Sequence, residues 1–193
     1  MESKIKEMFP KWCSDNEKNY ELMLTDDIDS LVSCALLNKI NAYHINYFYD
    51  FETIYEIKES DTPAIAIDCD LINGRCWSNH VTMLSEDDTV NSKSANLNNI
   101  FGISRDNYYK KFCGSTALQI WSYYNIPLPS SEEGKMALLA IDGGYLGHYD
   151  KRFIEVHSRY LNMMGFDELI EVLKRHTKYE FYDIEKKYNM KRK

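Results

Sequence analysis

Residues 20–37 read YELMLTDDIDSLVSCALL, and the order of residue types in this stretch decides the fold. Its first residues are mostly apolar and stop at the acidic run 26–29. Apolar residues then recur every three or four positions, which is the spacing of one helix face. The pattern predicts a strand, a tight turn and a helix over 28–40, capped by Asp29 or Ser30. The acids then lie at the carboxyl end of a strand, where open α/β sheets bind ligands.

The acids in this turn have two explanations. One is helix capping, because an acid at a helix start accepts from free N–H groups and is favoured by the helix dipole. A single acid is enough for that role, whereas Asp26, Asp27 and Asp29 crowd together and repel one another unless a cation neutralises them. Asp27 and Asp29, which flank Ile28, are therefore candidate ligands of a divalent metal bound through oxygen.

The same arrangement recurs further along the chain. Residues 64–67 read AIAI, a continuous apolar run expected of a buried parallel strand, and Asp68 follows it directly. Residues 42–49 are rich in Tyr, Ile and Phe and predict another strand, and a short helix is expected near 54–57. Two strands thus deliver acids at their carboxyl ends.

The second half of the chain is predicted to be helical. Helices are expected over 106–125 and 132–141, and the second leads into Asp142-Gly143-Gly144. Gly-Gly also suits a plain turn, because glycine adopts positive φ without strain. Two amphipathic helices follow, and the basic end at 182–193 is expected to be solvated. We expect an α/β fold: a doubly wound, mostly parallel sheet with helices on both faces and a helical C-terminal extension.

Composition limits the class of protein. Of the 193 residues, 44% are hydrophobic, which favours a globular core, and the net charge of -7 disfavours a broad nucleic-acid-binding surface. No apolar run is long enough to cross a bilayer, and the first residues lack the apolar core of a signal peptide. Five scattered cysteines favour reduced thiols. We expect a cytoplasmic protein without a membrane partner, and the richness in Asn, Ile, Lys and Tyr suggests a low-GC bacterium or a phage.

The candidate site residues share one chemistry. Carboxylates and one imidazole suit Mn²⁺ or Mg²⁺ rather than structural zinc, which prefers Cys and His. Two such ions bridged by one Asp form a clamp for a phosphoryl group. The residues concerned are Asp27, Asp29, Asp68, His80 and Asp142.

This series resembles the DHH phosphoesterase family. The resemblance rests on Asp27-Ile28-Asp29-Ser30, Asp68, Asn79-His80 and the run 138–144, LLAIDGG; residues 114–118, GSTAL, resemble the helix start before the last motif. It implies two metal ions, with Asp27 and Asp29 on different ions, Asp68 bridging them, and His80 and Asp142 completing the second site. Asp68 and His80 would be catalytic, and the substrate would be a nucleotide or short oligonucleotide.

The sequence departs from the family in several places. The family has a His two residues before the first Asp, where this chain has Thr25. The D-H-H motif aligns either as residues 79–81 or as residues 78–80, and Gly143 stands where Thr is usual. We see no counterpart of the family's second, substrate-gripping domain, which a homodimer or a partner protein could replace.

Two functions therefore stay open at this point. The first is a metal-dependent phosphoesterase that hydrolyses a phosphate ester of a nucleotide or short oligonucleotide. The second is a catalytically silent DHH-like module that binds a nucleotide or a protein. Arg75 and Arg105 are expected near the metal edge as phosphate contacts, because Arg matches phosphate oxygens bidentately. Residues 1–149 are expected to form the DHH-like α/β domain and residues 150–193 the helical extension.

Overall fold

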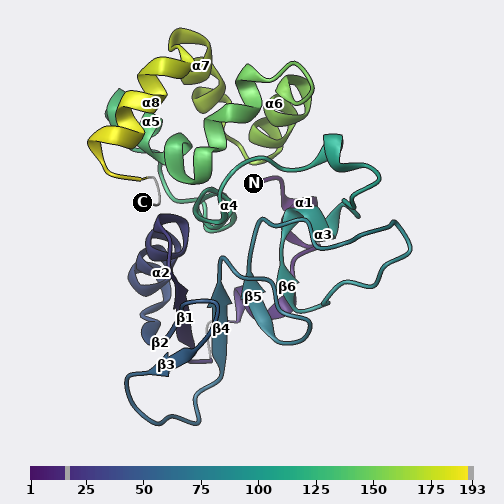
Figure 1. The fold of residues 1–193 in the computed structure, drawn as a ribbon, viewed down its shortest axis with the longest axis vertical. Helices are drawn as coiled ribbons and strands as arrows, with labels where there is room; N and C mark the ends of the chain where they lie inside the picture. Colours follow the sequence, from purple (N-terminus) through teal and green to yellow (C-terminus); the bar gives the residue numbers. More distant parts are fainter. Residues whose placement is uncertain (16–17, 191–193) are drawn as a thin grey trace.

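The computed structural model describes residues 1–15 and 18–190, and a six-stranded sheet organises this part of the chain. The strand order is β3-β2-β1-β4-β5-β6 (Figure 1). The strands are β1 (Glu21–Thr25), β2 (His44–Tyr49), β3 (Ile54–Glu56), β4 (Ala64–Ile67), β5 (Arg75–Trp77) and β6 (Ser94–Ala95). Every neighbouring pair is parallel except β2 with β3. The expected α/β fold with a mostly parallel sheet is therefore confirmed.

The edge strand β3 lies where we expected a short helix, so that prediction was wrong. The chain reverses after β2 in a turn that the Asp50 carboxylate closes by accepting the N–H groups of Glu52 and Thr53. The N–H of Ile57 then donates to the carbonyl of Asn46 across the hairpin. Hydrogen bonds to the neighbouring strand stabilise this segment as a strand, whatever the spacing of its apolar residues.

The helices lie mostly after the sheet in the sequence. The α-helices are α1 (Ser3–Lys6), α2 (Ile28–Asn41), α3 (Leu97–Ile100), α4 (Thr116–Tyr123), α5 (Glu132–Ala140), α6 (Ile154–Met163), α7 (Asp167–Arg175) and α8 (Lys178–Lys187). Three 3₁₀ segments join them: η1 (Lys11–Ser14), η2 (Tyr108–Lys110) and η3 (Ile141–Tyr149). Figure 1 shows α2 beside the sheet and α4 to α8 grouped at its upper end.

The single helix expected over 106–125 is instead η2, an extended segment and α4. The N–H of Phe112 donates to the Asn98 side chain, which holds the chain in a non-helical path there. Ser115 is extended and caps α4 by accepting the N–H of Leu118. Because the cap residue is itself outside the helix, α4 begins at Thr116. The helix start expected at residues 114–118 is thus present.

The two faces of the sheet are covered differently. Leu22, Ile65 and Trp77 belong to the large core cluster, which also holds the buried side chains of the helices. Met23 and Ala66 point to the opposite face, in a small cluster to which no described helix contributes a side chain. The helices therefore concentrate on one face of the sheet, and the expectation of helices on both faces was wrong for the described residues.

The C-terminal helices belong to the same core. Leu169 of α7 and Phe181 of α8 are fully buried in the large cluster, and α5 packs against both helices. Part of the run 182–193 that we expected to be solvated is helical and packed, because Glu185 is only 6% exposed. Residues 191–193 lie outside the described residues. The end of α8 is thereby brought to the site described below.

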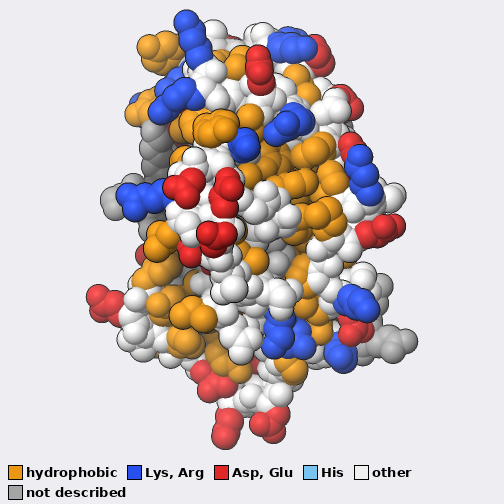
Figure 2. Space-filling view, turned by 90° about the vertical axis from the view of Figure 1, so that its right-hand side faces the viewer, with side chains coloured by type: hydrophobic (Ala, Val, Ile, Leu, Met, Phe, Trp, Pro, Cys, Tyr) orange, Lys and Arg blue, Asp and Glu red, His pale blue; other side chains and the backbone are white. Residues whose placement is uncertain are grey.

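The surface fits the acidic composition. Figure 2 shows one face on which hydrophobic side chains are widely exposed and basic and acidic side chains are scattered around them. The described residues form no broad basic surface on that face. Among the described residues, no helix is both long enough and apolar enough to cross a bilayer.

Candidate active site

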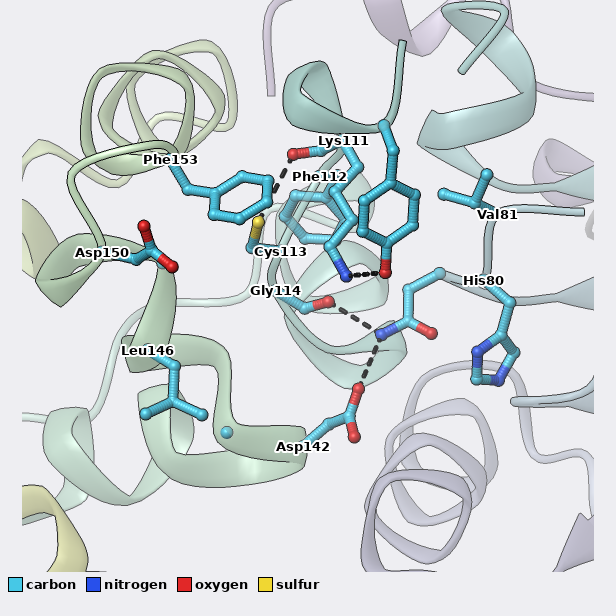
Figure 3. Close-up of a pocket in the computed structure, with 14 residues that line it drawn as sticks. His80, Val81, Lys111, Phe112, Cys113, Gly114, Asp142, Leu146, Asp150 and Phe153 are labelled. Atoms are coloured by element: carbon cyan, nitrogen blue, oxygen red, sulfur yellow. Dashed lines mark hydrogen bonds between the residues drawn. The ribbon is translucent and has the colours of Figure 1, made fainter. Parts of the chain in front are cut away.

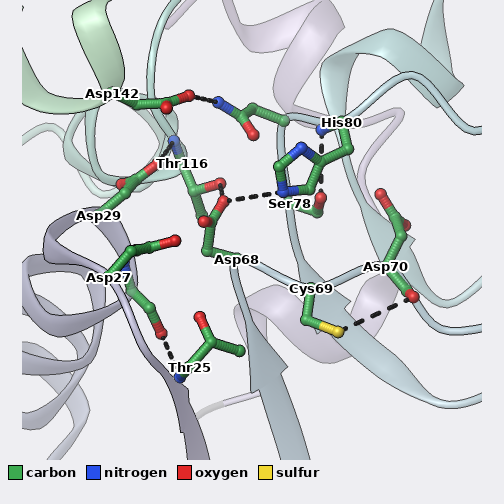
Figure 4. A network of polar contacts seen from close by, with 12 residues as sticks. Thr25, Asp27, Asp29, Asp68, Cys69, Asp70, Ser78, His80, Thr116 and Asp142 are labelled. Atoms are coloured by element: carbon green, nitrogen blue, oxygen red, sulfur yellow. Dashed lines mark hydrogen bonds and ion pairs between the residues drawn. The ribbon is translucent and has the colours of Figure 1, made fainter. Parts of the chain in front are cut away.

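A cavity of about 410 Å³ opens at the carboxyl ends of β1 and β4, and we call it the acid cavity. It is lined by Asp27, Ile28, Asp29, Phe51, Asp68, His80, Ala140, Asp142, Gly143, Glu185 and Met190. The five residues expected as metal ligands all lie on its wall (Figure 4). They come from four separate parts of the sequence. The parallel sheet brings Asp27, Asp29, Asp68 and His80 to one edge as expected, and Asp142 follows α5.

The turn after β1 is fixed by Asp27 and Ser30. Asp27 caps α2, because its carboxylate accepts the N–H of Ser30 at 2.8 Å. The Ser30 hydroxyl accepts the N–H of Thr25 at 2.8 Å and donates to the carbonyl of Ile67 at 3.0 Å. This joins β1, α2 and β4, and it corrects the expectation that Asp29 or Ser30 is the cap. Thr25 is buried and does not line the acid cavity.

Asp29 holds the start of a second helix. Its two carboxylate oxygens accept the N–H groups of Thr116 and Ala117, each at 2.7 Å, at the N-terminus of α4. The side chain is 2% exposed. Burial raises the pKa of Asp29 well above its ordinary value, and the nearby Asp68 carboxylate raises it further, although both N–H groups oppose this. The partner helix is distant in sequence, so the sequence did not indicate this contact.

Asp68 is held both by its backbone conformation and by neighbouring side chains. Its φ of 54° places it in the left-handed region, which a residue other than glycine seldom adopts. The Thr116 hydroxyl donates to its Oδ1 at 2.8 Å, and the His80 Nε2 lies 3.5 Å from the same oxygen. Burial raises the pKa of Asp68 to about 7. His80 opposes this shift, whereas the charge of Asp27 and a hydrogen bond with it add to the shift.

Asp142 completes the ring of acids from the opposite side. It follows α5 with a φ of 51°, and Gly143 after it has a φ of 62°. The Asn79 amide donates to the Asp142 Oδ2 at 3.1 Å and to the carbonyl of Gly114 at 2.8 Å. Two of the four acids thus stand on strained backbone, a feature that clusters at functional sites.

The side chains that line the acid cavity are of the chemical types that bind a hard divalent cation. Four carboxylates and the imidazole of His80 line one cavity, and the repulsion between them favours a positive ion. The geometry is not that of a closed site: in the described part of the chain, no group of three or more His, Cys, Asp and Glu side chains could hold a metal as the side chains lie. The oxygens of Asp29 are committed to α4. His80, which is 52% exposed, and the half-buried Asp27 already lie beside Asp68.

The two predicted phosphate contacts lie elsewhere. Arg75 begins β5, so it stands at the opposite end of a parallel strand from the acids, with its guanidinium 5.0 Å from the centre of the Tyr20 ring. Arg105 is exposed, and neither arginine lines the acid cavity. Asp70, close in sequence to Asp68, accepts the Ser94 hydroxyl at 2.6 Å and lies outside the acid cavity as well.

Three residues of the site were missed by sequence reasoning. Thr116 bridges Asp29 and Asp68 through its N–H and its hydroxyl. Asn79 orients Asp142, and Glu185 of α8 adds a fifth carboxylate to the wall of the acid cavity. Asn79 and Thr116 lie in the motifs that carried the resemblance, so their position was a usable signal. Nothing in the sequence pointed to Glu185.

Comparison of the chain with family models, with curated proteins and with solved structures found no match. The resemblance to DHH phosphoesterases therefore rests on the sequence motifs quoted above.

Proposed function

We propose that the chain is a metal-dependent phosphoesterase of DHH type, which hydrolyses a phosphate ester of a nucleotide or short oligonucleotide in the acid cavity. The observation that carries the proposal is the buried Asp68, in contact with His80, with Thr116 and with a second carboxylate, Asp27. A carboxylate pair in a buried site needs a proton or a cation between its members. At neutral pH a divalent cation meets that need.

Asp27 and Asp68 are the residues that would hold the first Mn²⁺ or Mg²⁺ ion, and Asp68, His80 and Asp142 would hold the second. When bound, such ions supply positive charge for the phosphate and lower the pKa of water enough for attack at neutral pH. The chain supplies the positioning: Thr116 fixes Asp68, and Asn79 fixes Asp142. His80 lies at the exposed rim beside Asp68, with its Nε2 3.5 Å from the Asp68 Oδ1, so both side chains would reach the same ion.

A second candidate is a silent module of the same fold that binds a nucleotide or a protein. The observation in its favour is Asp29, whose two oxygens both accept backbone N–H groups of α4 and are thereby engaged within the protein. Asn79 in place of a motif acid points the same way. In this case the acid cavity would bind without turnover.

Hydrolysis of bis-p-nitrophenyl phosphate and of a dinucleotide, measured with the full chain in EDTA and then in Mn²⁺, separates the two candidates. The test variant is Asp68→Asn, and the matched control is Asp26→Asn, an exposed acid of the same turn that does not line the acid cavity. The phosphoesterase proposal expects Mn²⁺-dependent turnover that falls at least a hundredfold in Asp68→Asn and is kept in Asp26→Asn. An absence of turnover on both substrates at millimolar Mn²⁺ contradicts it and leaves the binding module.

A further inference from the structure

A second cavity, of about 290 Å³, adjoins the acid cavity, and we call it the side cavity. The two share His80, Asp142 and Gly143 as lining residues, so they lie side by side. The residues of the side cavity that matter here are Asn79, Tyr108, Lys111, Asp150 and Phe153 (Figure 3). Its volume is at the lower end of the range for small-molecule sites, so it suits one nucleoside rather than an oligonucleotide.

The side cavity contains a fixed hydrogen-bond acceptor. Asn79 is 9% exposed, and its Nδ2 donates to the Gly114 carbonyl and to the Asp142 carboxylate. Both partners can only accept, so the amide orientation is determined. The Asn79 Oδ1 is buried and has no hydrogen-bond partner among the described residues. A buried carbonyl oxygen of this kind calls for a donor, such as an N–H of a base or a hydroxyl of a sugar.

The opposite wall offers a donor and flat apolar surface. The Lys111 Nζ lies 2.7 Å from the Tyr108 hydroxyl and 4.5 Å from the centre of its ring, which leaves further N–H groups for a ligand. Phe153 is half-buried, and Figure 3 shows its ring beside the cavity. Aromatic side chains of this kind stack on nucleobases.

The charge of the lining indicates which part of a nucleotide fits. One ammonium group, that of Lys111, and two carboxylates, those of Asp142 and Asp150, line the side cavity, so it disfavours a second phosphate. An uncharged group with ring faces, donors and acceptors suits it better. The phosphate then belongs in the acid cavity, where a cation would compensate its charge.

We propose that the side cavity binds the nucleoside of the substrate, with Asn79, Lys111 and Phe153 as its contacts, so that the enzyme acts on a single or terminal nucleotide. The proposal rests on the proposed function of the acid cavity, because that function places the scissile phosphate in the acid cavity, beside the nucleoside. It adds to that function a substrate class and three specificity residues.

The test is an NMR titration of the metal-free full chain with the four ribonucleosides, and with ribose as the matched probe that lacks a base. Nucleosides carry no phosphate, so their binding does not depend on a metal. We expect at least one nucleoside to bind at least tenfold more tightly than ribose. Lys111→Met and Phe153→Leu should each weaken it at least fivefold. The neighbouring Lys110→Met should leave it unchanged, because Lys110 is exposed and does not line the side cavity.

Equal binding of ribose and the nucleosides, or no binding of either, overturns the side-cavity proposal without recourse to any variant. Hydrolysis of bis-p-nitrophenyl phosphate, which has no nucleoside, separates this failure from failure of the proposed function. Turnover without nucleoside binding contradicts the proposal for the side cavity and supports the phosphoesterase proposal. Nucleoside binding without turnover supports the proposal for the side cavity and contradicts the phosphoesterase proposal.

Discussion

Asp68 should make the metal-free protein lose stability as the pH rises. Its pKa in the folded chain is raised from the ordinary 3.8 to about 7, which corresponds to roughly 4 kcal/mol between the two protonation states. Because the folded-state pKa is the higher one, the contribution is fully present below the unfolded pKa. It is lost as the pH rises through the folded pKa. Between pH 5 and pH 8 the free energy of unfolding should therefore fall by roughly 3 kcal/mol.

The perturbation that tests this reasoning is Asp68→Asn, an uncharged side chain of nearly the same shape. Urea unfolding in EDTA at pH 5, 6, 7 and 8 gives the free energy of unfolding for each protein. We expect a flatter pH dependence in the variant and a variant more stable than the wild type at pH 8. Asp29 keeps part of the slope, because burial raises its pKa as well. Mn²⁺ should stabilise the wild type at pH 8 by binding the folded state alone.

The matched control is Asp26→Asn, which removes the same charge from an exposed position of the same turn. It should keep the pH dependence of the wild type. If Asp68→Asn and the wild type lose stability in parallel between pH 5 and pH 8, the account of Asp68 as a buried acid without a compensating cation is refuted.

Three further predictions concern single contacts. Thr116→Val removes the hydroxyl that donates to Asp68, and that hydrogen bond favours the ionised acid. The substitution should therefore lower the free energy of unfolding by about 1–2 kcal/mol at pH 8, and by less at pH 5, as measured by urea unfolding. An equal loss at the two pH values contradicts the reasoning. Trp77→Ala should cost about 3–5 kcal/mol in the same assay, because the side chain is fully buried, and a cost below 1 kcal/mol would mean that the core there is not packed as described. Thr177→Ala removes the capping box with Glu180 and should cost about 1 kcal/mol, whereas the exposed Tyr179→Ala should change stability by less than about 0.5 kcal/mol; equal effects would rule out the cap.

The parts of the fold that follow from local patterns could be predicted from the sequence. Apolar runs that end at Thr25 and Ile67, directly before acids, indicated β1 and β4, and the periodicity after Asp27 indicated α2. Since the strands are parallel, their carboxyl ends meet, and this alone placed Asp27 and Asp68 on one cavity.

The remaining features depend on contacts between distant parts of the chain. Asp27 caps α2, because the carboxylate of Asp29 accepts a backbone N–H at the N-terminus of α4 instead. The expected helix near residues 54–57 became β3 because a turn and a neighbouring strand complete its hydrogen bonds. Glu185 reaches the acid cavity because α8 packs against α5. The sequence of α8 by itself does not indicate this packing.

If the proposed function is right, the acid cavity binds a divalent cation through Asp68. Calorimetric titration of the EDTA-treated, dialysed full chain with Mn²⁺ at pH 8 measures this directly, with Asp68→Asn as the test and Asp26→Asn as the control. The account predicts saturable Mn²⁺ binding by the wild type and by Asp26→Asn, and affinity at least a hundredfold weaker in Asp68→Asn. No binding by the wild type at millimolar Mn²⁺, or equal binding by Asp68→Asn, would contradict it.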